Sequence, residues 1–125
     1  MRMAFILAQR SYDPRLQVGC IITDHDNRRV VGLGYNGNAK KMPHEPESLE
    51  PGQSGFVHAE MNAIINAHDK LYSGNVYLTH SPCLICAKML INAGVWSVTY
   101  ANAYRDDSPL ELLRRAGVYV HEYAQ

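Results

Sequence analysis

Two short motifs in the middle of this chain constrain its fold more than any other feature. One is H-A-E at positions 58–60, and the other is P-C-L-I-C at positions 82–86. Imidazole and thiolate are ligands that zinc favours, and a catalytic zinc keeps three protein ligands and one open position for water. We predict that His58, Cys83 and Cys86 bind Zn2+, which leaves Glu60 as a carboxylate without a metal to bind. The fold must therefore bring two distant segments together.

Both motifs are expected at the beginning of a helix. The first helix is predicted from about His58 to His68, and the second from about Cys83 to Ala93, where Gly94 ends it. Proline favours a helix start, and Pro82 stands directly before Cys83. Residues three apart share one helical face, and a helix N-terminus stabilises thiolates. Two helix starts are therefore expected to converge on one metal ion.

The chemistry assigned to this site needs both the metal and the free carboxylate. Zinc lowers the pKa of its bound water to about 7. Glu60 is the predicted catalytic residue, because an unligated carboxylate can take the proton of that water and pass it on to a substrate.

The cysteines also allow other interpretations. A C-x-x-C pair alone is also typical of redox proteins and of structural zinc sites. A redox pair does not account for His58 and Glu60. A structural site needs a fourth ligand, for which Cys20 is the available cysteine. However, Cys20 lies in the apolar run 18–22, where a free cysteine usually packs in the core. The catalytic interpretation is favoured.

Composition sets the class of protein. A chain of 125 residues is expected to form a single domain, residues 1–125. There are 12 Lys and Arg residues and 12 Asp and Glu residues, so the chain lacks the excess of positive charge that is typical of polynucleotide-binding proteins. No apolar stretch approaches the ~20 residues of a membrane span. With two of three cysteines assigned to metal, no disulfide framework remains, and a cytoplasmic location is expected.

The predicted elements follow the order α-β-β-α-β-α-β-α-β, which favours a three-layer α/β/α sandwich around a five-stranded mixed sheet. Besides the two motif helices, a helix opens the chain to about Gln9 or Arg10, and another runs from about Pro109 to Ala116. Strands are predicted at 18–23, 29–33, 75–79, 95–100 and 118–122. Strands separated by one helix are expected to be parallel neighbours. The irregular stretch 34–55 is long enough to be functional.

Four segments together resemble deoxycytidylate (dCMP) deaminases of the cytidine deaminase-like superfamily. They are D-P-R-L-Q-V-G at 13–19, G-Y-N-G at 34–37, H-A-E-M-N-A-I at 58–64 and S-P-C-L-I-C-A-K at 81–88. H-x-E with P-C-x-x-C marks zinc nucleobase deaminases in general. The G-Y-N-G and N-A-I segments favour the dCMP members. The resemblance runs from about Ala4 to the C-terminus, and implies zinc-dependent conversion of a pyrimidine nucleotide, dCMP, to dUMP with release of ammonia.

The resemblance also implies roles for residues that bind the substrate. Asn36 is expected to hydrogen-bond the sugar, although a left-handed turn residue before Gly37 is an open alternative. The backbone N–H of Ala59, at a helix start, is expected to hold the pyrimidine carbonyl oxygen. The Ser81 carbonyl is expected to accept a hydrogen bond from the exocyclic amine. Tyr104 is expected either to wall the pocket or to cap the sheet edge.

A 5′-phosphate needs a cation or a helix N-terminus. Arg105, beside Tyr104, is the first candidate, and Lys40 and Lys41 are the second.

Some properties of the family are not carried over. The stretch between Gly37 and His58 is short and lacks residues of the members regulated by dCTP and dTTP, and the early first helix leaves open that an N-terminal segment is missing. By analogy we expect a homo-oligomer, a dimer or a hexamer. Alternative substrates are cytidine, cytosine, guanine and tRNA adenosine, but the tRNA enzymes typically carry E-P-C-x-M-C. A non-catalytic, zinc-stabilised binding module has no use for Glu60.

Overall fold

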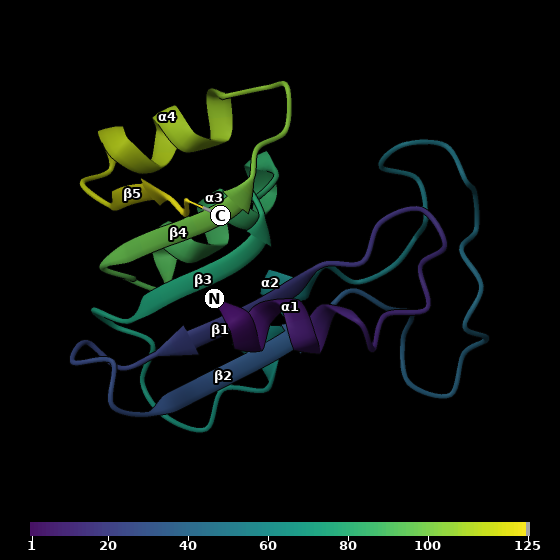
Figure 1. Ribbon diagram of the computed structural model, residues 1–125, viewed down its shortest axis with the longest axis horizontal. Helices are drawn as coiled ribbons and strands as arrows, with labels where there is room; N and C mark the ends of the chain where they lie inside the picture. The colour runs from purple at the N-terminus through teal and green to yellow at the C-terminus, as the bar shows by residue number, and fades with distance from the viewer. Residues whose placement is uncertain (125) are drawn as a thin grey trace.

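A five-stranded sheet organises the computed structural model, which describes residues 1–124 (Figure 1). Its strands are β1 (Gly19–Thr23), β2 (Val30–Tyr35), β3 (Asn75–His80), β4 (Ser97–Asn102) and β5 (Tyr119–Glu122). The helices in the same residues are α1 (Arg2–Ala8), α2 (Ala59–Ile65), α3 (Leu84–Asn92) and α4 (Ser108–Arg115). The predicted order of elements is confirmed.

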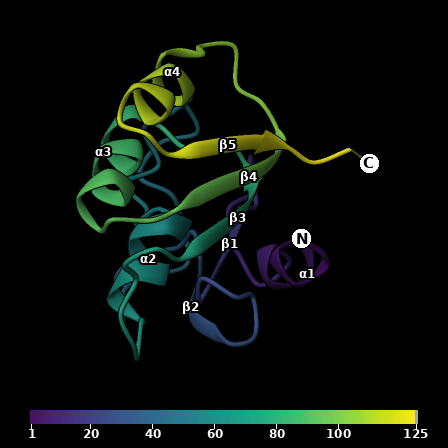
Figure 2. The same cartoon turned by 90° about the vertical axis from the view of Figure 1, so that its left-hand side faces the viewer.

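The sheet lies between two unequal layers of helices (Figure 2). Helices α2, α3 and α4 cover one face, and α1 packs on the other face against β1 and β3. Strand β1 is antiparallel to β2 and β3, whereas β3, β4 and β5 run parallel. The predicted three-layer α/β/α sandwich with a mixed sheet is therefore confirmed.

The position of β1 differs from the prediction. The strands run in the order β2-β1-β3-β4-β5. Strands β2 and β3 are joined through α2 and were predicted to be neighbours, but β1 lies between them. All five residues of β1 are buried, whereas Leu33 of β2 is 42% exposed. A fully buried strand is best placed inside a sheet, and a half-exposed strand at its edge. The prediction was wrong because it considered only the helical connection.

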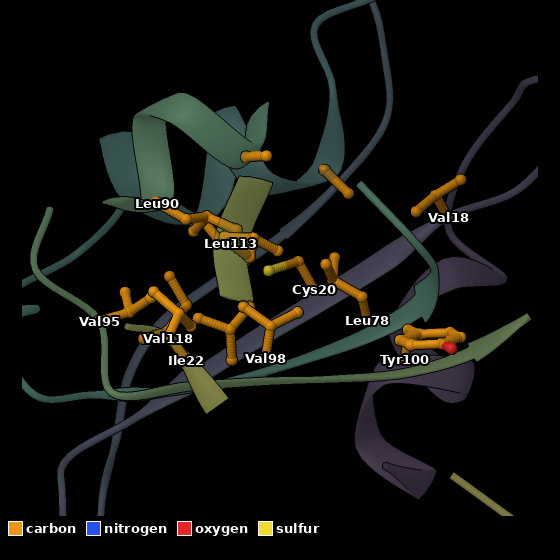
Figure 3. Close-up of a cluster of buried hydrophobic side chains, with 14 of the residues drawn as sticks. Val18, Cys20, Ile22, Leu78, Leu90, Val95, Val98, Tyr100, Leu113 and Val118 are labelled. Carbon is orange, nitrogen blue, oxygen red and sulfur yellow. The ribbon is translucent and has the colours of Figure 1, made fainter. Parts of the chain in front are cut away.

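The main core fills the space between the sheet and helices α2, α3 and α4 (Figure 3). Cys20 lies in it with its sulfur among apolar neighbours such as Ile22, Leu78 and Val98. Its side chain is completely buried, and burial raises the pKa of this thiol well above its ordinary value. Cys20 thus behaves as a small core residue, as expected from its apolar surroundings in the sequence.

Gly34 explains how α2 comes close to the sheet. A Cβ atom at this position would lie 2.6 Å from the Ala59 carbonyl oxygen, closer than real Cβ contacts allow. Only glycine lets the first turn of α2 pack directly on β2. The G-Y-N-G segment therefore has a packing role, which fixes the start of α2 next to the end of β2.

Helix α2 is shorter than predicted. It ends at Ile65 rather than near His68, because the backbone N–H of His68 donates to the Val31 carbonyl at 3.0 Å and turns the chain toward β2. Helices α3 and α4 are followed by Gly94 and Gly117, both with positive φ, as the sequence predicted. None of the helices within residues 1–124 has the length and apolar character needed to cross a membrane.

One end of the sheet collects the segments that form the candidate site. Strands β2, β3 and β4 run in the same direction, so the chain leaves all three at this end. The long connection 36–58 extends beyond it (Figure 1), tied by one bridge between Gly37 and Val57. Ligand sites of α/β sheets commonly lie at the carboxyl ends of the strands.

Candidate metal centre and the adjoining cavity

The start of α2 and the start of α3 bring three metal-binding groups together. His58 is the N-cap of α2 and Cys83 the N-cap of α3, while Cys86 lies in the first turn of α3. Their ligand atoms all lie within 4.8 Å of one another. In the part of the chain that the structure describes, this is the one such cluster, and Cys20 is not part of it. A closed site with Cys20 as fourth ligand is therefore not supported.

The distances fit one tetrahedral ion. The Nδ1 atom of His58 lies 3.3 Å from the Cys86 sulfur and 3.5 Å from the Cys83 sulfur. Two ligands of a tetrahedral zinc, each roughly 2.0–2.3 Å from the ion, are about 3.3–3.8 Å apart. The three groups thus fit Zn2+ with a fourth position left for a small molecule.

The charge state of the sulfurs also suits a cation. The pKa of Cys83 is lowered to about 4 by a hydrogen bond from the Cys86 side chain and by one from His58. The pKa of Cys86 is raised by its hydrogen bond to Cys83 and by burial. Two adjacent thiolates repel each other, so a divalent cation between them is what allows both sulfurs to be deprotonated.

Glu60 stands beside the cluster without belonging to it. It is the second residue of α2 and only 4% exposed. Burial raises its pKa from 4.5 to about 7, although its own backbone N–H and the charge of His58 act in the opposite direction. A carboxyl group with a pKa near neutrality can both accept and donate a proton at that pH. The environment thus fits the proton-transfer role predicted for Glu60.

A cavity of about 400 Å³ opens beside these groups. This volume is in the usual range for small-molecule sites. The lining comes from five segments around the end of the sheet. It includes Asp13, Arg15, Leu16, Val18, Asn36, Ser48, Glu50, Pro51, Gly52, Ser54, Phe56, His58, Ala59, Glu60, Ser81, Pro82, Cys83, Leu84, Tyr104, Asp106 and Pro109. The long connection after β2 therefore forms one wall, as its length suggested.

Asn36 lies in this lining, but most of its side chain is already engaged. Its Oδ1 accepts the Val18 N–H at 2.8 Å, and its Nδ2 donates to the Leu16 carbonyl at 2.8 Å and to Asp13 at 3.3 Å. One lone pair of Oδ1 remains for a ligand. Asn36 does not have a positive φ, so the alternative of a left-handed turn residue is wrong.

Three further predicted residues line the same cavity. Ala59 is the first residue of α2, where a backbone N–H has no partner inside the helix. Ser81 follows β3, and its hydroxyl accepts the backbone N–H of Tyr104 at 2.9 Å. This bond connects the segments after β3 and β4 and places Tyr104, which is 42% exposed, in the cavity wall.

The cations are placed differently from the sequence-based expectation. Arg105, Lys40 and Lys41 are all exposed, and none of them lines the cavity. The arginine in the lining is Arg15, which sequence reasoning did not select. A signal was present, because Arg15 stands inside the D-P-R-L-Q-V-G segment that carries part of the family resemblance.

Comparison with known proteins identifies the family. Residues 1–102 match the family model of the cytidine and deoxycytidylate deaminase zinc-binding region. The chain belongs to this family. The resemblance to deoxycytidylate deaminases that the sequence motifs indicated is thereby confirmed.

Curated relatives and a solved structure place this deaminase-family chain more closely. It is 38% identical to a probable deoxycytidylate deaminase of Drosophila melanogaster, over 87% of this chain and 60% of that protein. It is 35% identical to the deoxycytidylate deaminase of Homo sapiens, over 86% and 65% of the two chains. The crystal structure of dCMP deaminase from the cyanophage S-TIM5, in complex with dCMP and dUMP, matches with a TM-score of 0.87 and 31% sequence identity. The match covers 98% of this chain and 92% of the cyanophage chain.

Proposed function

We propose that this chain is a zinc-dependent deaminase that hydrolyses dCMP to dUMP and ammonia. The observation that carries the proposal is the cavity in which three zinc-type ligands, His58, Cys83 and Cys86, lie beside the buried carboxyl group of Glu60. A structural zinc site has no need of that carboxyl group or of an open cavity. The family and the relatives with dCMP deaminase names support the same reaction.

The metal ion has a defined part in this proposal. His58 Nδ1 and the sulfurs of Cys83 and Cys86 would hold Zn2+. When bound, zinc supplies Lewis acidity that lowers the pKa of a bound water to about 7.

Glu60 moves the protons. As a carboxylate it removes a proton from the attacking water, and as a carboxylic acid it delivers that proton to N3 of the ring. It then takes the proton of the new hydroxyl group on C4 and delivers it to the departing amine, so that the C4 carbonyl of dUMP forms as ammonia leaves. The reaction balances as dCMP plus water giving dUMP plus ammonia. A pKa of about 7 keeps both forms of Glu60 accessible near neutral pH.

The remaining residues bind and orient the nucleotide. The Ala59 N–H donates to the pyrimidine carbonyl oxygen, and the Ser81 carbonyl accepts from the exocyclic amine. Asn36 accepts a sugar hydroxyl on its remaining lone pair, and Tyr104 forms a side of the pocket. All four line the cavity that also contains Glu60, which supports these assignments.

A substrate panel tests the proposal. Ammonia release is measured from dCMP, deoxycytidine, cytidine, cytosine, guanine and adenosine with the zinc-loaded chain. The highest kcat/KM is expected for dCMP. A preference for guanine or adenosine would overturn the substrate assignment, and no release from any compound would favour a non-catalytic zinc module.

We also propose that the protein is a cytoplasmic homo-oligomer that acts on the free nucleotide and has no polynucleotide partner.

A further inference from the structure

One cation of the cavity rim has no side-chain partner among the residues that the structure describes. Arg15 is exposed and lines the cavity, and it forms no ion pair or side-chain hydrogen bond with any residue in 1–124. Its charge nevertheless reaches into the site. Burial raises the pKa of Tyr104 to about 12, and the positive charge of Arg15 opposes this rise. Arg15 and Tyr104 both line the cavity.

The loop that carries Arg15 is held in place from both sides. The Asp13 Oδ1 atom accepts the backbone N–H of Arg15 at 2.8 Å and that of Leu16 at 3.3 Å, and Pro14 fits the turn this makes. Asn36 then fixes the same loop through Asp13, Leu16 and Val18. The Arg15 backbone is thus ordered without any bond to its guanidinium group.

The charges around Arg15 make it decisive for an anionic ligand. Besides Glu60, three acidic residues line the cavity, namely Asp13, Glu50 and Asp106. Asp13 accepts hydrogen bonds from the backbone of Arg15 and Leu16 and from the Asn36 side chain, and Asp106 accepts two from Ser108. A phosphate group entering this rim meets repulsion unless Arg15 compensates for it.

We propose that Arg15 binds the 5′-phosphate and makes this site select a nucleoside monophosphate over the free nucleoside, an inference that rests on the proposed function. An unpaired guanidinium can bind a phosphate through two parallel hydrogen bonds. The arrangement puts the charged end of the nucleotide at the exposed rim, while the uncharged pyrimidine goes to the buried end with Glu60.

The test compares two substrates that differ only in the phosphate. For the zinc-loaded full chain, kcat/KM is measured for dCMP and for deoxycytidine, in the parent protein, in Arg15→Gln and in the matched control Arg105→Gln. In Arg15→Gln the value for dCMP should fall by about 10- to 100-fold, as expected for a lost charged hydrogen bond. The value for deoxycytidine should stay unchanged. Arg105→Gln should change neither.

Several results would overturn the inference. An equal loss for both substrates in Arg15→Gln would show a structural role, and a selective loss in Arg105→Gln would move the phosphate to that residue. Calorimetric binding of dUMP and deoxyuridine adds a readout without turnover. If the parent protein binds dUMP more tightly than deoxyuridine, and Arg15→Gln does not, the inference stands even where ammonia release and hence the proposed function fail.

Discussion

Cys20 and Cys86 have the same side chain and the same complete burial, yet they belong to different regions of the molecule. The sulfur of Cys20 faces aliphatic side chains of the sheet and helices (Figure 3). The sulfur of Cys86 faces His58 at 3.3 Å and also interacts with Cys83 and Glu60. Burial alone therefore does not distinguish a structural cysteine from a functional one. The polar partners do.

The difference arises from local structure. Cys20 is on the internal strand β1, whose residues are all buried and which pairs with β2 on one side and with β3 on the other. Cys86 is in the first turn of α3, where backbone N–H groups stabilise negative charge. A strand interior favours an inert thiol, and a helix start favours a metal-binding thiolate.

The largest expected effect comes from replacing the functional cysteine. Cys86→Ala removes one of three zinc ligands, so the variant should lose stoichiometric zinc and with it all measurable ammonia release. Metal analysis by mass spectrometry and the dCMP assay check both. Full zinc content in a folded Cys86→Ala variant would contradict the ligand assignment, and with it the functional difference between Cys86 and Cys20.

A second prediction separates the metal from the proton carrier. Glu60→Gln keeps the shape of the side chain and removes its acid–base chemistry, so kcat for dCMP should fall by about 10²–10⁴-fold. Zinc content should not change, because Glu60 is outside the ligand cluster. Loss of zinc together with activity would make Glu60 a metal ligand instead.

The smallest effect is expected at the structural cysteine. Cys20→Ser places a hydroxyl group in an apolar part of the core, which should lower the free energy of unfolding by about 1–3 kcal/mol. Zinc content and kcat/KM should stay at parental values. Urea denaturation, metal analysis and the ammonia assay measure these three quantities. A folded Cys20→Ser variant without zinc would show that the two cysteines are not as different as the structure indicates.

Local sequence information was sufficient for much of this molecule. The order of helices and strands followed from apolar periodicity and from breakers such as Gly94 and Gly117, which do end α3 and α4. The ligand cluster followed from the spacing of Cys83 and Cys86 and from the chemistry of His58. These features depend on neighbours within one helix turn, or on a motif whose chemistry has few alternatives.

Long-range arrangement is what the sequence did not determine. The insertion of β1 between β2 and β3 depends on which strand edges pair, and this is decided by the whole core. Arg15 lies in a motif segment and Arg105 stands beside Tyr104, and only the fold decides which of the two arginines lines the cavity. The hydrogen bonds of the Asn36 side chain also depend on long-range structure, because all three join it to a segment about twenty residues earlier in the chain.

Zinc K-edge X-ray absorption of the purified zinc-loaded chain tests the central claim most directly. We expect two sulfur ligands at roughly 2.3 Å and two nitrogen or oxygen ligands at roughly 2.0–2.1 Å, from His58 and one exchangeable molecule. Three sulfur ligands, or none, would contradict an open site formed by one imidazole and two thiolates.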